Sequence, residues 1–240
     1  MKRETLTLTG NRPLNSSVFE LTFTGASPMS AGQFVELTAE GFFLRRPISV
    51  ADWEDGKLTL LVRIAGEGTK KMSELRAGDK VDALTCLGNG FDLSAQKPLL
   101  IGGGIGCAPL YKLAKDFAAK GIRPEIVLGF RNADETYYVG EFSALGNVTV
   151  ATDDGSAGVK GNAVAAALGA GKDFDLYYAC GPAVMLRALC AADARGQVSL
   201  EARMGCGFGA CMGCSIKTTG GFRRVCKEGP VFRASEVIWE

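Results

Sequence analysis

Histidine is absent from all 240 residues of this chain. The chain therefore lacks the side chain that most often titrates near neutral pH and most often supplies a nitrogen ligand to a metal. A Rieske iron–sulfur centre, which needs two imidazole ligands, is excluded. No paired carboxylates and no serine-centred triad stand out either. We therefore expect no acid–base catalysis by the chain itself.

Long apolar segments and a charge excess are also missing. No apolar run approaches the ~20 residues that span a bilayer, and the N-terminal sequence lacks the apolar core of a signal peptide. A formal net charge of +1 predicts no broad nucleic-acid-binding surface. We expect neither nucleic acid nor a membrane as a partner, and we expect a cytoplasmic location.

Glycine and cysteine, by contrast, are concentrated between residues 204 and 226. Cys206, Cys211, Cys214 and Cys226 have the spacing C-x4-C-x2-C-x11-C, and glycines surround the first three. Thiolates are the usual ligands of iron–sulfur clusters, and this spacing is typical of the plant-type [2Fe–2S] site. Glycine permits the tight loop and lets peptide N–H groups approach the cluster sulfurs. The four cysteines are therefore predicted to hold a [2Fe–2S] cluster.

Two alternatives use the same four cysteines. A structural zinc site usually presents two C-x2-C-like knuckles, whereas the first gap here is four residues long. Disulfides are expected even less, because cytosolic thiols stay reduced and no signal peptide is seen. A zinc-binding module without flavin is therefore the non-enzymatic alternative.

Residues 1–93 contain short runs of β-branched and aromatic residues separated by turn signals, which predicts an antiparallel barrel or sandwich. Arg46 precedes Pro47 at the start of one strand, and arginine forms bidentate contacts with phosphate. A turn at Gly68 and Thr69 then enters a short helix, which points backbone N–H groups at an anion. Together these features suggest a pyrophosphate ligand. For the arginine alone, a solvated strand edge is the alternative.

From residue 98 the pattern changes to alternating strands and helices. Such a βαβ series predicts a parallel, doubly wound sheet, in which ligands bind beyond the carboxyl ends of the strands. A glycine-rich turn at 102–109 joins the first strand to the first helix, as a dinucleotide-phosphate loop requires. It is not the G-x-G-x-x-G fingerprint, because Pro109 stands where the third glycine would come, and a tight strand-to-helix turn without a ligand is the alternative. Leu110, Leu113 and Phe117 recur at helical spacing in the first helix, and a last strand is expected over residues 198–202. Further unusual turns fall at strand ends near 129–131, 152–156 and 180–182. Asp153 and Asp154 are interpreted either as ribose ligands or as turn caps.

These motifs together resemble the ferredoxin–NADP reductase superfamily. The resemblance rests on R-P-I-S and G-x-G-T in the first part and on G-G-G-I-G-x-A-P and C-G-P in the second. It implies an FAD-binding β-barrel over residues 1–93 and an NAD(P)-binding α/β domain over 98–200. A small [2Fe–2S] module over 201–240, placed after the nucleotide domain, is similar to the electron-transfer subunits of class B dihydroorotate dehydrogenases.

The resemblance also implies which residues contact each cofactor. The FAD contacts would be Arg46, Pro47, Ile48, Ser49, Leu61, Val62, Arg63, Gly68 and Thr69. The NAD(H) contacts would be Gly103, Gly104, Ile105, Gly106, Ala108, Pro109, Asp153, Cys180, Gly181 and Pro182. Cys180 would either help to position the nicotinamide ring or serve as a small buried residue at a strand end. Trp239 is expected to pack against the protein and not to shield the flavin.

The implied function is electron transfer between NAD(H), FAD, the [2Fe–2S] cluster and an FMN-containing catalytic subunit that converts dihydroorotate into orotate in pyrimidine biosynthesis. The resemblance implies one FAD and one cluster per subunit, and a heterotetramer of two catalytic and two electron-transfer subunits. Related subunits of sulfide dehydrogenases and of NADH-dependent ferredoxin:NADP oxidoreductases are alternatives. Arg131 could meet a 2′-phosphate, whereas Asp153 and Asp154 disfavour one, so NADH is favoured mainly by the resemblance.

Overall fold

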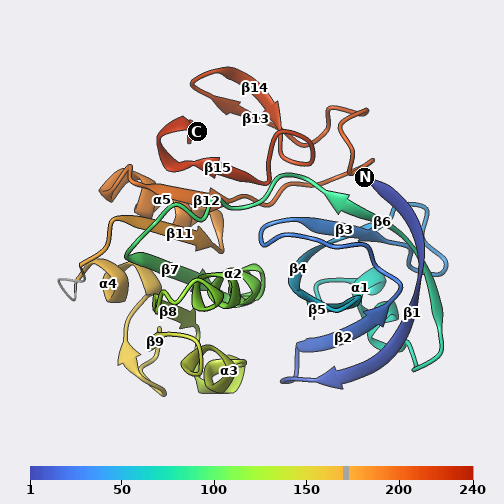
Figure 1. Cartoon of the computed structure of the whole chain (residues 1–240), viewed down its shortest axis with the longest axis horizontal. Coiled ribbons are helices and arrows are strands. Elements are labelled where there is room, and N and C mark those ends of the chain that lie inside the picture. The colour runs from blue at the N-terminus through green and yellow to red at the C-terminus, as the bar shows by residue number, and fades with distance from the viewer. Residues whose placement is uncertain (170–172, 240) are drawn as a thin grey trace.

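The computed structural model describes residues 1–169 and 173–239. Residues 170–172 and 240, which fall in the predicted ranges 98–200 and 201–240, lie outside the described residues. Figure 1 shows a barrel beside an α/β sheet, with the C-terminal segment lying across one end of both. In the described ranges no helix is long and apolar enough to cross a membrane.

Six antiparallel strands close into the barrel, in the order β1-β2-β5-β4-β3-β6. Alternate residues point inward, as in β6, where Val81, Ala83, Thr85 and Leu87 are buried. The predicted antiparallel barrel is confirmed, and β6, which the sequence analysis did not single out, closes it between β1 and β3. The strands are β1 (Lys2–Pro13), β2 (Val18–Thr24), β3 (Phe34–Leu37), β4 (Arg46–Glu54), β5 (Lys57–Arg63) and β6 (Lys80–Leu87), and helix α1 (Glu67–Ser73) follows β5.

The second sheet has seven strands in the order β10-β9-β8-β7-β11-β12-β15. All neighbours are parallel except β12 and β15, so the predicted doubly wound parallel sheet is confirmed and carries one antiparallel edge strand. The strands are β7 (Pro98–Gly103), β8 (Glu125–Phe130), β9 (Asn147–Thr152), β10 (Val159–Lys160), β11 (Leu176–Cys180), β12 (Gly196–Ser199) and β15 (Val231–Arg233).

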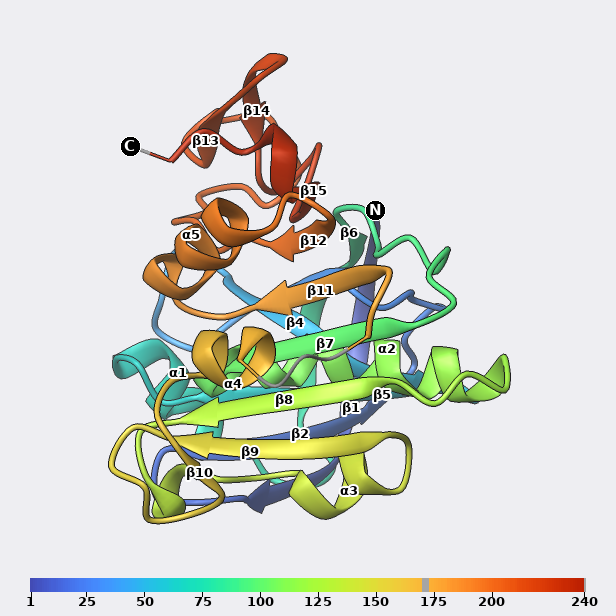
Figure 2. The ribbon, with the colours of Figure 1, turned by 90° about the vertical axis from the view of Figure 1, so that its left-hand side faces the viewer.

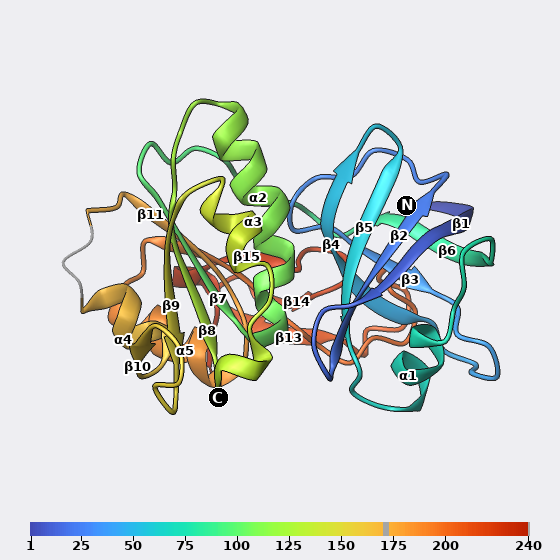
Figure 3. The same cartoon turned by 90° about the horizontal axis from the view of Figure 1, so that it is seen from below.

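Helices cover both faces of this sheet. They are α2 (Ala108–Ala119), α3 (Val139–Ser143), α4 (Ala163–Leu168) and α5 (Ala183–Ala192), with 3-10 turns η1 (Gly104–Cys107), η2 (Ala133–Glu135) and η3 (Ala234–Glu236). Figure 2 shows α4 and α5 on the face toward the viewer, and Figure 3 shows α2 between the sheet and the barrel. In α2, Leu110, Leu113 and Phe117 form a buried stripe at helical spacing, as the sequence predicts.

The barrel and the nucleotide domain share one apolar core and a polar contact beside it. Ala51 and Leu61 of the barrel belong to the same buried cluster as the apolar stripe of α2. At the rim of this cluster, the Lys115 ammonium lies 2.6 Å from an Asp52 carboxylate oxygen and 3.1 Å from one of Glu54. These contacts fix how the carboxyl ends of the sheet face the barrel.

One strand begins earlier than the sequence indicates. We expected the strand over residues 198–202, but β12 covers Gly196–Ser199. Gly196 lies under the ring of Tyr177, so that an added Cβ would fall 2.2 Å from a ring carbon. A glycine carries no β-strand signal of its own, and the ring that needs it comes from another strand, which explains the shift.

The C-terminal segment is joined to the nucleotide sheet. Hairpin strands β13 (Ser215–Thr218) and β14 (Gly221–Arg224) stand apart as a two-stranded sheet, and β15 then returns to pair with β12. The segment after residue 200 therefore contributes an edge strand to the sheet of the domain before it. The predicted division at residues 93, 98 and 200 remains a proposal.

Asn89 fastens this segment to the end of the barrel. Its side-chain amide donates to the carbonyls of Val231, at 2.8 Å, and Glu228, at 3.2 Å, and its carbonyl accepts the Val231 N–H at 3.0 Å. Its own backbone N–H donates to the Gly229 carbonyl at 2.7 Å. One side chain thus satisfies the backbone polar groups of a segment more than a hundred residues away.

We predict that Asn89→Ala lowers the free energy of unfolding by about 1–3 kcal/mol, because it leaves part-buried backbone groups without partners. Thermal unfolding followed by circular dichroism measures this loss. Asn89→Asp is the matched variant: it keeps an acceptor for the Val231 N–H, but it places a carboxylate oxygen against the Val231 and Glu228 carbonyl oxygens to which the amide donates, so its loss should be at least as large as that of Asn89→Ala. Equal stability of wild type and Asn89→Ala would contradict the fastening role.

Candidate functional site

The strand order brings two of the predicted turns together. The chain begins its sheet at β7, moves outward through β8 and β9, and returns to β11 on the other side of β7. Ligands of doubly wound sheets bind beyond the carboxyl ends of the strands at such a reversal. In register, Gly102 of β7 lies opposite Cys180 of β11. The glycine-rich turn and the C-G-P turn are therefore neighbours, as a shared nucleotide site requires.

Two glycines of the first turn have different roles. A Cβ on Gly106 would lie 2.3 Å from the Cys180 carbonyl oxygen and 2.6 Å from the Gly181 nitrogen, so only glycine lets these backbones touch. Gly104 has φ of +54° and open space where a side chain would be. A left-handed backbone open to solvent suits the close approach of a phosphate. Gly106 therefore closes the turn, and Gly104 leaves room for a ligand.

A cavity of about 240 Å³ lies between the barrel and the nucleotide domain, and it is called the flavin cavity below because most of the predicted FAD contacts line it. From the predicted FAD contacts it is lined by Pro47, Ile48, Ser49, Leu61, Val62, Arg63 and Thr69. From the predicted NAD(H) contacts it is lined by Ile105, Gly106, Ala108, Pro109 and Cys180. The structure therefore brings part of each predicted set to one cavity, where two ligands would meet.

The two adjacent arginines before Pro47 have separate tasks. Arg45 is bound to Asp82, with one carboxylate oxygen at 2.8 Å and the backbone carbonyl at 3.0 Å, so it serves the barrel. Arg46 donates to the Leu44 carbonyl at 2.7 Å and stacks over the ring of Phe42. An added Cβ on Gly68 would lie 2.2 Å from the Arg46 guanidinium, so the two predicted phosphate contacts are side by side.

The Thr69 hydroxyl shapes the turn in which it lies. It accepts hydrogen bonds from the N–H groups of Ala65, at 2.9 Å, and Gly66, at 3.2 Å, and donates to the Gly66 carbonyl at 3.0 Å. Its other atoms line the cavity. Thr69 therefore positions the turn beside Gly68, and its hydroxyl is already engaged.

A larger cavity, of about 630 Å³, lies at the carboxyl ends of β7, β8 and β9 and at the start of α5. Gly103, Gly104, Asp153 and Pro182 of the predicted NAD(H) contacts line it. Arg63 lines both this cavity and the first one. Arg131, considered above as a possible 2′-phosphate contact, also lines the larger cavity. The lining of this cavity further includes residues that the sequence analysis did not assign to a cofactor, namely Gly129, Phe130, Glu135, Asn162, Ala163, Val164, Ala165, Leu168, Val184, Met185 and Ala188.

The buried thiols at the junction are chemically quiet. Burial, and then the nearby Glu201 carboxylate, raise the pKa of Cys180 to about 12. Burial likewise raises the pKa of Cys107. The thiolate is the reactive form, so neither cysteine acts as a nucleophile near neutral pH. Cys180 is therefore a neutral, buried side chain at the end of β11. This fits both expected roles, namely positioning the nicotinamide ring and filling space as a small buried residue.

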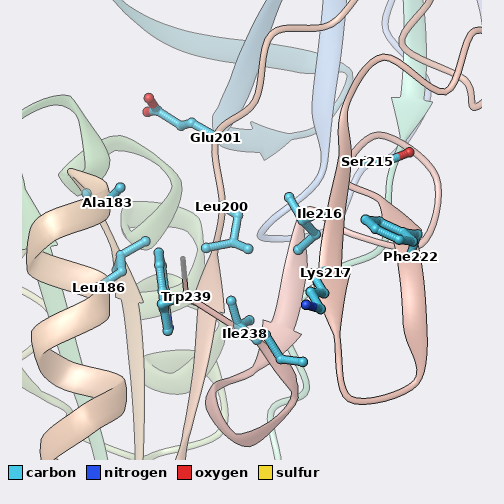
Figure 4. Close-up of a pocket in the computed structure, with 12 residues that line it drawn as sticks. Ala183, Leu186, Leu200, Glu201, Ser215, Ile216, Lys217, Phe222, Ile238 and Trp239 are labelled. Carbon is cyan, nitrogen blue, oxygen red and sulfur yellow. The ribbon is translucent and has the colours of Figure 1, made fainter.

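A third cavity, of about 520 Å³, separates α5 from the C-terminal segment. Figure 4 shows Leu186, Leu200 and Trp239 on one side of it, facing Ile216 across the opening. Gly181, the remaining predicted NAD(H) contact, lines it too. Trp239 lies here and not in the flavin cavity, in agreement with its expected packing role.

Glu201 is a charged residue beside the predicted cofactor contacts that the sequence analysis did not assign. It lines both the flavin cavity and the third cavity, directly after the last parallel strand and five residues before Cys206. The signal available in the sequence was its place at the end of a strand beside the cluster loop. Its charge beside Cys180 puts a carboxylate next to the junction of the two predicted cofactor sites.

The four predicted ligand cysteines form two pairs. Cys214 and Cys226 are buried, with their sulfurs 3.2 Å apart. The other pair is nearer the surface: the Cys206 sulfur accepts the N–H groups of Ala210, at 3.2 Å, and Cys211, at 3.5 Å, and Cys211 is exposed. Burial opposes the charged form of Cys206, but these and neighbouring N–H groups outweigh it and lower its pKa to about 6.

This arrangement of thiols fits a two-iron cluster. Over residues 1–169 and 173–239, no three or more Cys, Asp or Glu side chains are close enough together to hold a single metal ion. A [2Fe–2S] cluster spreads its four thiolates over two irons, which suits two separate pairs. Positive φ angles at Gly207, Gly209 and Met212 give the loop the curvature needed to surround such a core. The donor set therefore favours the cluster over a single zinc ion.

The buried pair shares its surroundings with the flavin cavity. Cys214 and Cys226 pack in the same apolar cluster as Phe34 and Leu200. Phe34 and Leu200 also line the flavin cavity. The buried cysteines and the flavin cavity thus draw on one apolar cluster, while the side of the cluster site that carries Cys211 faces outward.

Glu36 is a buried carboxyl between the barrel and the cluster loop. It is 1% exposed, and its Oε1 has no hydrogen-bond partner among the described residues. A Cβ on Gly207 would lie 2.6 Å from this oxygen, so the loop rests directly on the side chain. Burial raises the pKa of Glu36 to about 7, with Arg45 and Arg46 opposing the rise and Cys206 adding to it.

We predict that Glu36→Gln stabilises the protein at pH 8 relative to wild type, and that the difference disappears near pH 4.5. The ordinary pKa is 4.5 and the folded value about 7, so the folded state prefers the neutral acid. Wild type should therefore lose up to about 3 kcal/mol as pH rises from 4.5 to 7, whereas the amide does not titrate. Anaerobic thermal unfolding across this pH range measures it. A difference that does not vary with pH would contradict the buried carboxyl.

Comparison with known proteins identifies relatives of the chain. Residues 201–238 match the iron–sulfur cluster binding domain of dihydroorotate dehydrogenase B. The Bacillus caldolyticus protein named dihydroorotate dehydrogenase B (NAD(+)), electron transfer subunit, is 41% identical over 253 aligned residues, which cover 98% of each chain. The protein of the same name from Caldanaerobacter subterraneus subsp. tengcongensis is 42% identical over 241 residues, covering 95% of this chain and 96% of that one.

Solved structures agree with the fold. The structure of an NADH-dependent reduced ferredoxin-NADP oxidoreductase, studied for flavin-based electron bifurcation, has a TM-score of 0.87 and 30% identity and covers 98% of this chain and 90% of its own. Phthalate dioxygenase reductase, described as a modular structure for electron transfer from pyridine nucleotides to [2Fe–2S], has a TM-score of 0.68 and covers 90% and 86% of the two chains. At 15% identity this second likeness shows the fold alone.

Proposed function

Since the chain belongs to the family of electron transfer subunits of dihydroorotate dehydrogenase B, we propose that it passes electrons between NAD(H) and an FMN-containing catalytic subunit that converts dihydroorotate into orotate. One bound FAD and one [2Fe–2S] cluster would lie between them. When bound, FAD supplies the exchange between hydride pairs and single electrons, and the cluster carries single electrons. The sulfide dehydrogenase and ferredoxin:NADP alternatives are less favoured, because the 41% identical relative carries the dihydroorotate name.

The observation that carries the proposal is the position of the cysteine pairs. The buried pair, Cys214 and Cys226, belongs to the apolar cluster that also contributes Phe34 and Leu200 to the lining of the flavin cavity. Cys211 of the outer pair is exposed. A site that lies between the apolar core beside the flavin cavity and the protein surface is suited to electron transfer out of the subunit.

We propose that FAD is held along the edge of the barrel. Arg46 beside Gly68 would bind the pyrophosphate, with Thr69 holding the turn in shape. Pro47, Ile48 and Ser49 on β4, with Leu61, Val62 and Arg63 on β5, would contact the rest of the flavin. These walls exclude water from one side of the flavin cavity, which favours a defined ring orientation.

We propose that NAD(H) occupies the larger cavity at the carboxyl ends of the strands. Gly103 and Gly104 would accept the pyrophosphate, and Asp153 the adenosine ribose. Ile105, Gly106, Ala108, Pro109 and Cys180 would receive the nicotinamide end where it reaches the flavin cavity, near Gly181 and Pro182. Arg63, which lines both cavities, stands where the two cofactors would approach each other.

We propose that the catalytic subunit docks on the face that carries the outer cysteine pair. Phe208 is 41% exposed, Met212 53% and Phe222 75%. All three belong to the cluster loop or to the hairpin that follows it. Exposed large apolar side chains gathered in one segment are typical of a contact surface. A heterotetramer of two catalytic and two electron-transfer subunits, and a cytoplasmic location, are further parts of the proposal that rest on the resemblance.

Cys211→Ser tests the electron path. We expect the variant to retain FAD and to lose the visible absorbance of the cluster, because serine replaces a thiolate ligand. With the catalytic subunit present, NADH-linked reduction of orotate should fall to background. Cys190→Ser is the control, because Cys190 is half-buried and lies outside the ligand set. A variant with normal cluster absorbance would contradict the assignment, and wild type without NADH-linked orotate reduction would contradict the function.

Phe222→Asp tests the docking face. A charge at this exposed position should raise the dissociation constant for the catalytic subunit by about tenfold or more, equivalent to about 1.4 kcal/mol. The catalytic subunit should therefore co-purify less well with the variant. Cluster and flavin content should not change, because the side chain is largely exposed. Val159→Asp, at an exposed apolar residue of β10 that lies outside the cluster segment and outside the cavity linings described above, is the control. Equal losses in both variants would mean that the effect is not specific to this face.

A further inference from the structure

The rim of the larger cavity carries an ion pair that no cofactor role has yet explained. Arg131 follows β8, and its Nη2 is paired with Oε1 of Glu135 in η2. Both residues line the cavity, as does Asp153 after β9. The Arg131 side chain is 78% exposed, and an exposed ion pair contributes little to stability. Stabilisation of the fold therefore does not explain why the Arg131–Glu135 ion pair lies on the cavity rim, and a role in ligand binding is the alternative.

The backbone holds Glu135 in place from several directions. Its N–H donates to the side chain of Asn132 at 3.2 Å. Its carbonyl accepts from the side chain of Asn15 on the barrel at 3.0 Å. The neighbouring loop is joined to the loop after β9 by the bond from the Ala133 N–H to the Ser156 hydroxyl, at 2.8 Å. The carboxylate is thus presented to Arg131 by a fixed turn.

The charges at this end of the cavity do not suit a phosphate. One guanidinium, Arg131, faces two carboxylates, Glu135 and Asp153, and both raise its pKa, Glu135 more strongly. The other cation of the lining, Arg63, also lines the flavin cavity. An arginine that accommodates the 2′-phosphate of NADPH needs its N–H groups for that phosphate, whereas a carboxylate accepts from a free ribose hydroxyl.

We infer that Glu135 is a specificity-determining residue, which occupies the guanidinium of Arg131 and so withholds it from a 2′-phosphate. The site thereby selects a dinucleotide whose adenosine ribose carries a free 2′-hydroxyl. This inference rests on the proposed function, in that NAD(H) must bind in this cavity. Glu135 would thus set the preference for NAD(H) over NADP(H). Arg131 without Glu135 would favour the 2′-phosphate of NADP(H).

Binding of two adenosine fragments to the FAD-loaded protein tests the inference without any turnover. ADP and 2′,5′-ADP are compared by isothermal titration calorimetry for wild type and for Glu135→Gln. The variant should bind 2′,5′-ADP about tenfold more tightly, equivalent to about 1.4 kcal/mol, with ADP changed less than about twofold. Glu141→Gln, which removes an exposed carboxylate of α3 outside the cavity lining, is the control for net charge and should change neither.

The double variant Arg131→Ala/Glu135→Gln shows whether the arginine receives the phosphate. It should lose the gain of the single variant. If it keeps the gain, or if Glu135→Gln leaves the ratio of the two affinities unchanged while ADP and NADH still bind, the inference is wrong and the proposed function stands. If wild type binds neither NADH nor ADP, the proposed function itself fails. FAD content and the thermal midpoint confirm that each variant is folded.

Discussion

The antiparallel pairing of β15 with β12 is the constraint on which the arrangement of sites depends. It brings the end of the chain back to the edge of the nucleotide sheet after the excursion through the cluster loop and the hairpin. Asn89 then fastens the same returning segment to the barrel. The cluster loop is consequently held at both ends, by β12 before it and by β15 after it. Its buried cysteines cannot move away from the flavin cavity without breaking backbone hydrogen bonds.

A second constraint acts between the two cofactor domains. Gly106 touches the backbone of Cys180, and α2 packs against the barrel, so the two strand-end turns and the barrel edge have one relative position. The geometry is set by close backbone contacts and a shared apolar core, both of which resist small displacements. Electron transfer between bound groups depends on distance, so a rigid junction serves the chemistry better than a mobile one.

Much of the site could be predicted from the sequence because its signals are local. The cysteine spacing, the R-P-I-S run and the glycine-rich turn each occupy a few consecutive residues, and each of them lies in a cavity lining or in the cluster loop. Other features depend on contacts across the chain. Arg45 and Arg46 make different contacts because Asp82, which is distant in the sequence, binds Arg45. Strand β12 starts at Gly196 because the ring of Tyr177, from another strand, leaves no room for a side chain there. In the sequence Glu36 has no feature that distinguishes it from other strand residues. Its burial depends on the cluster loop, which covers its side chain at Gly207.

The exposed position of Cys211 has a consequence for the subunit when it is alone. A thiolate loop open to solvent is accessible to dioxygen and peroxide as well as to a partner protein. Electrons that reach the outer pair would then have an unproductive acceptor available, and the sulfurs would be open to oxidative damage. The catalytic subunit would therefore act as an insulating cover as well as an electron acceptor, so assembly would protect the cell from stray reduction of oxygen.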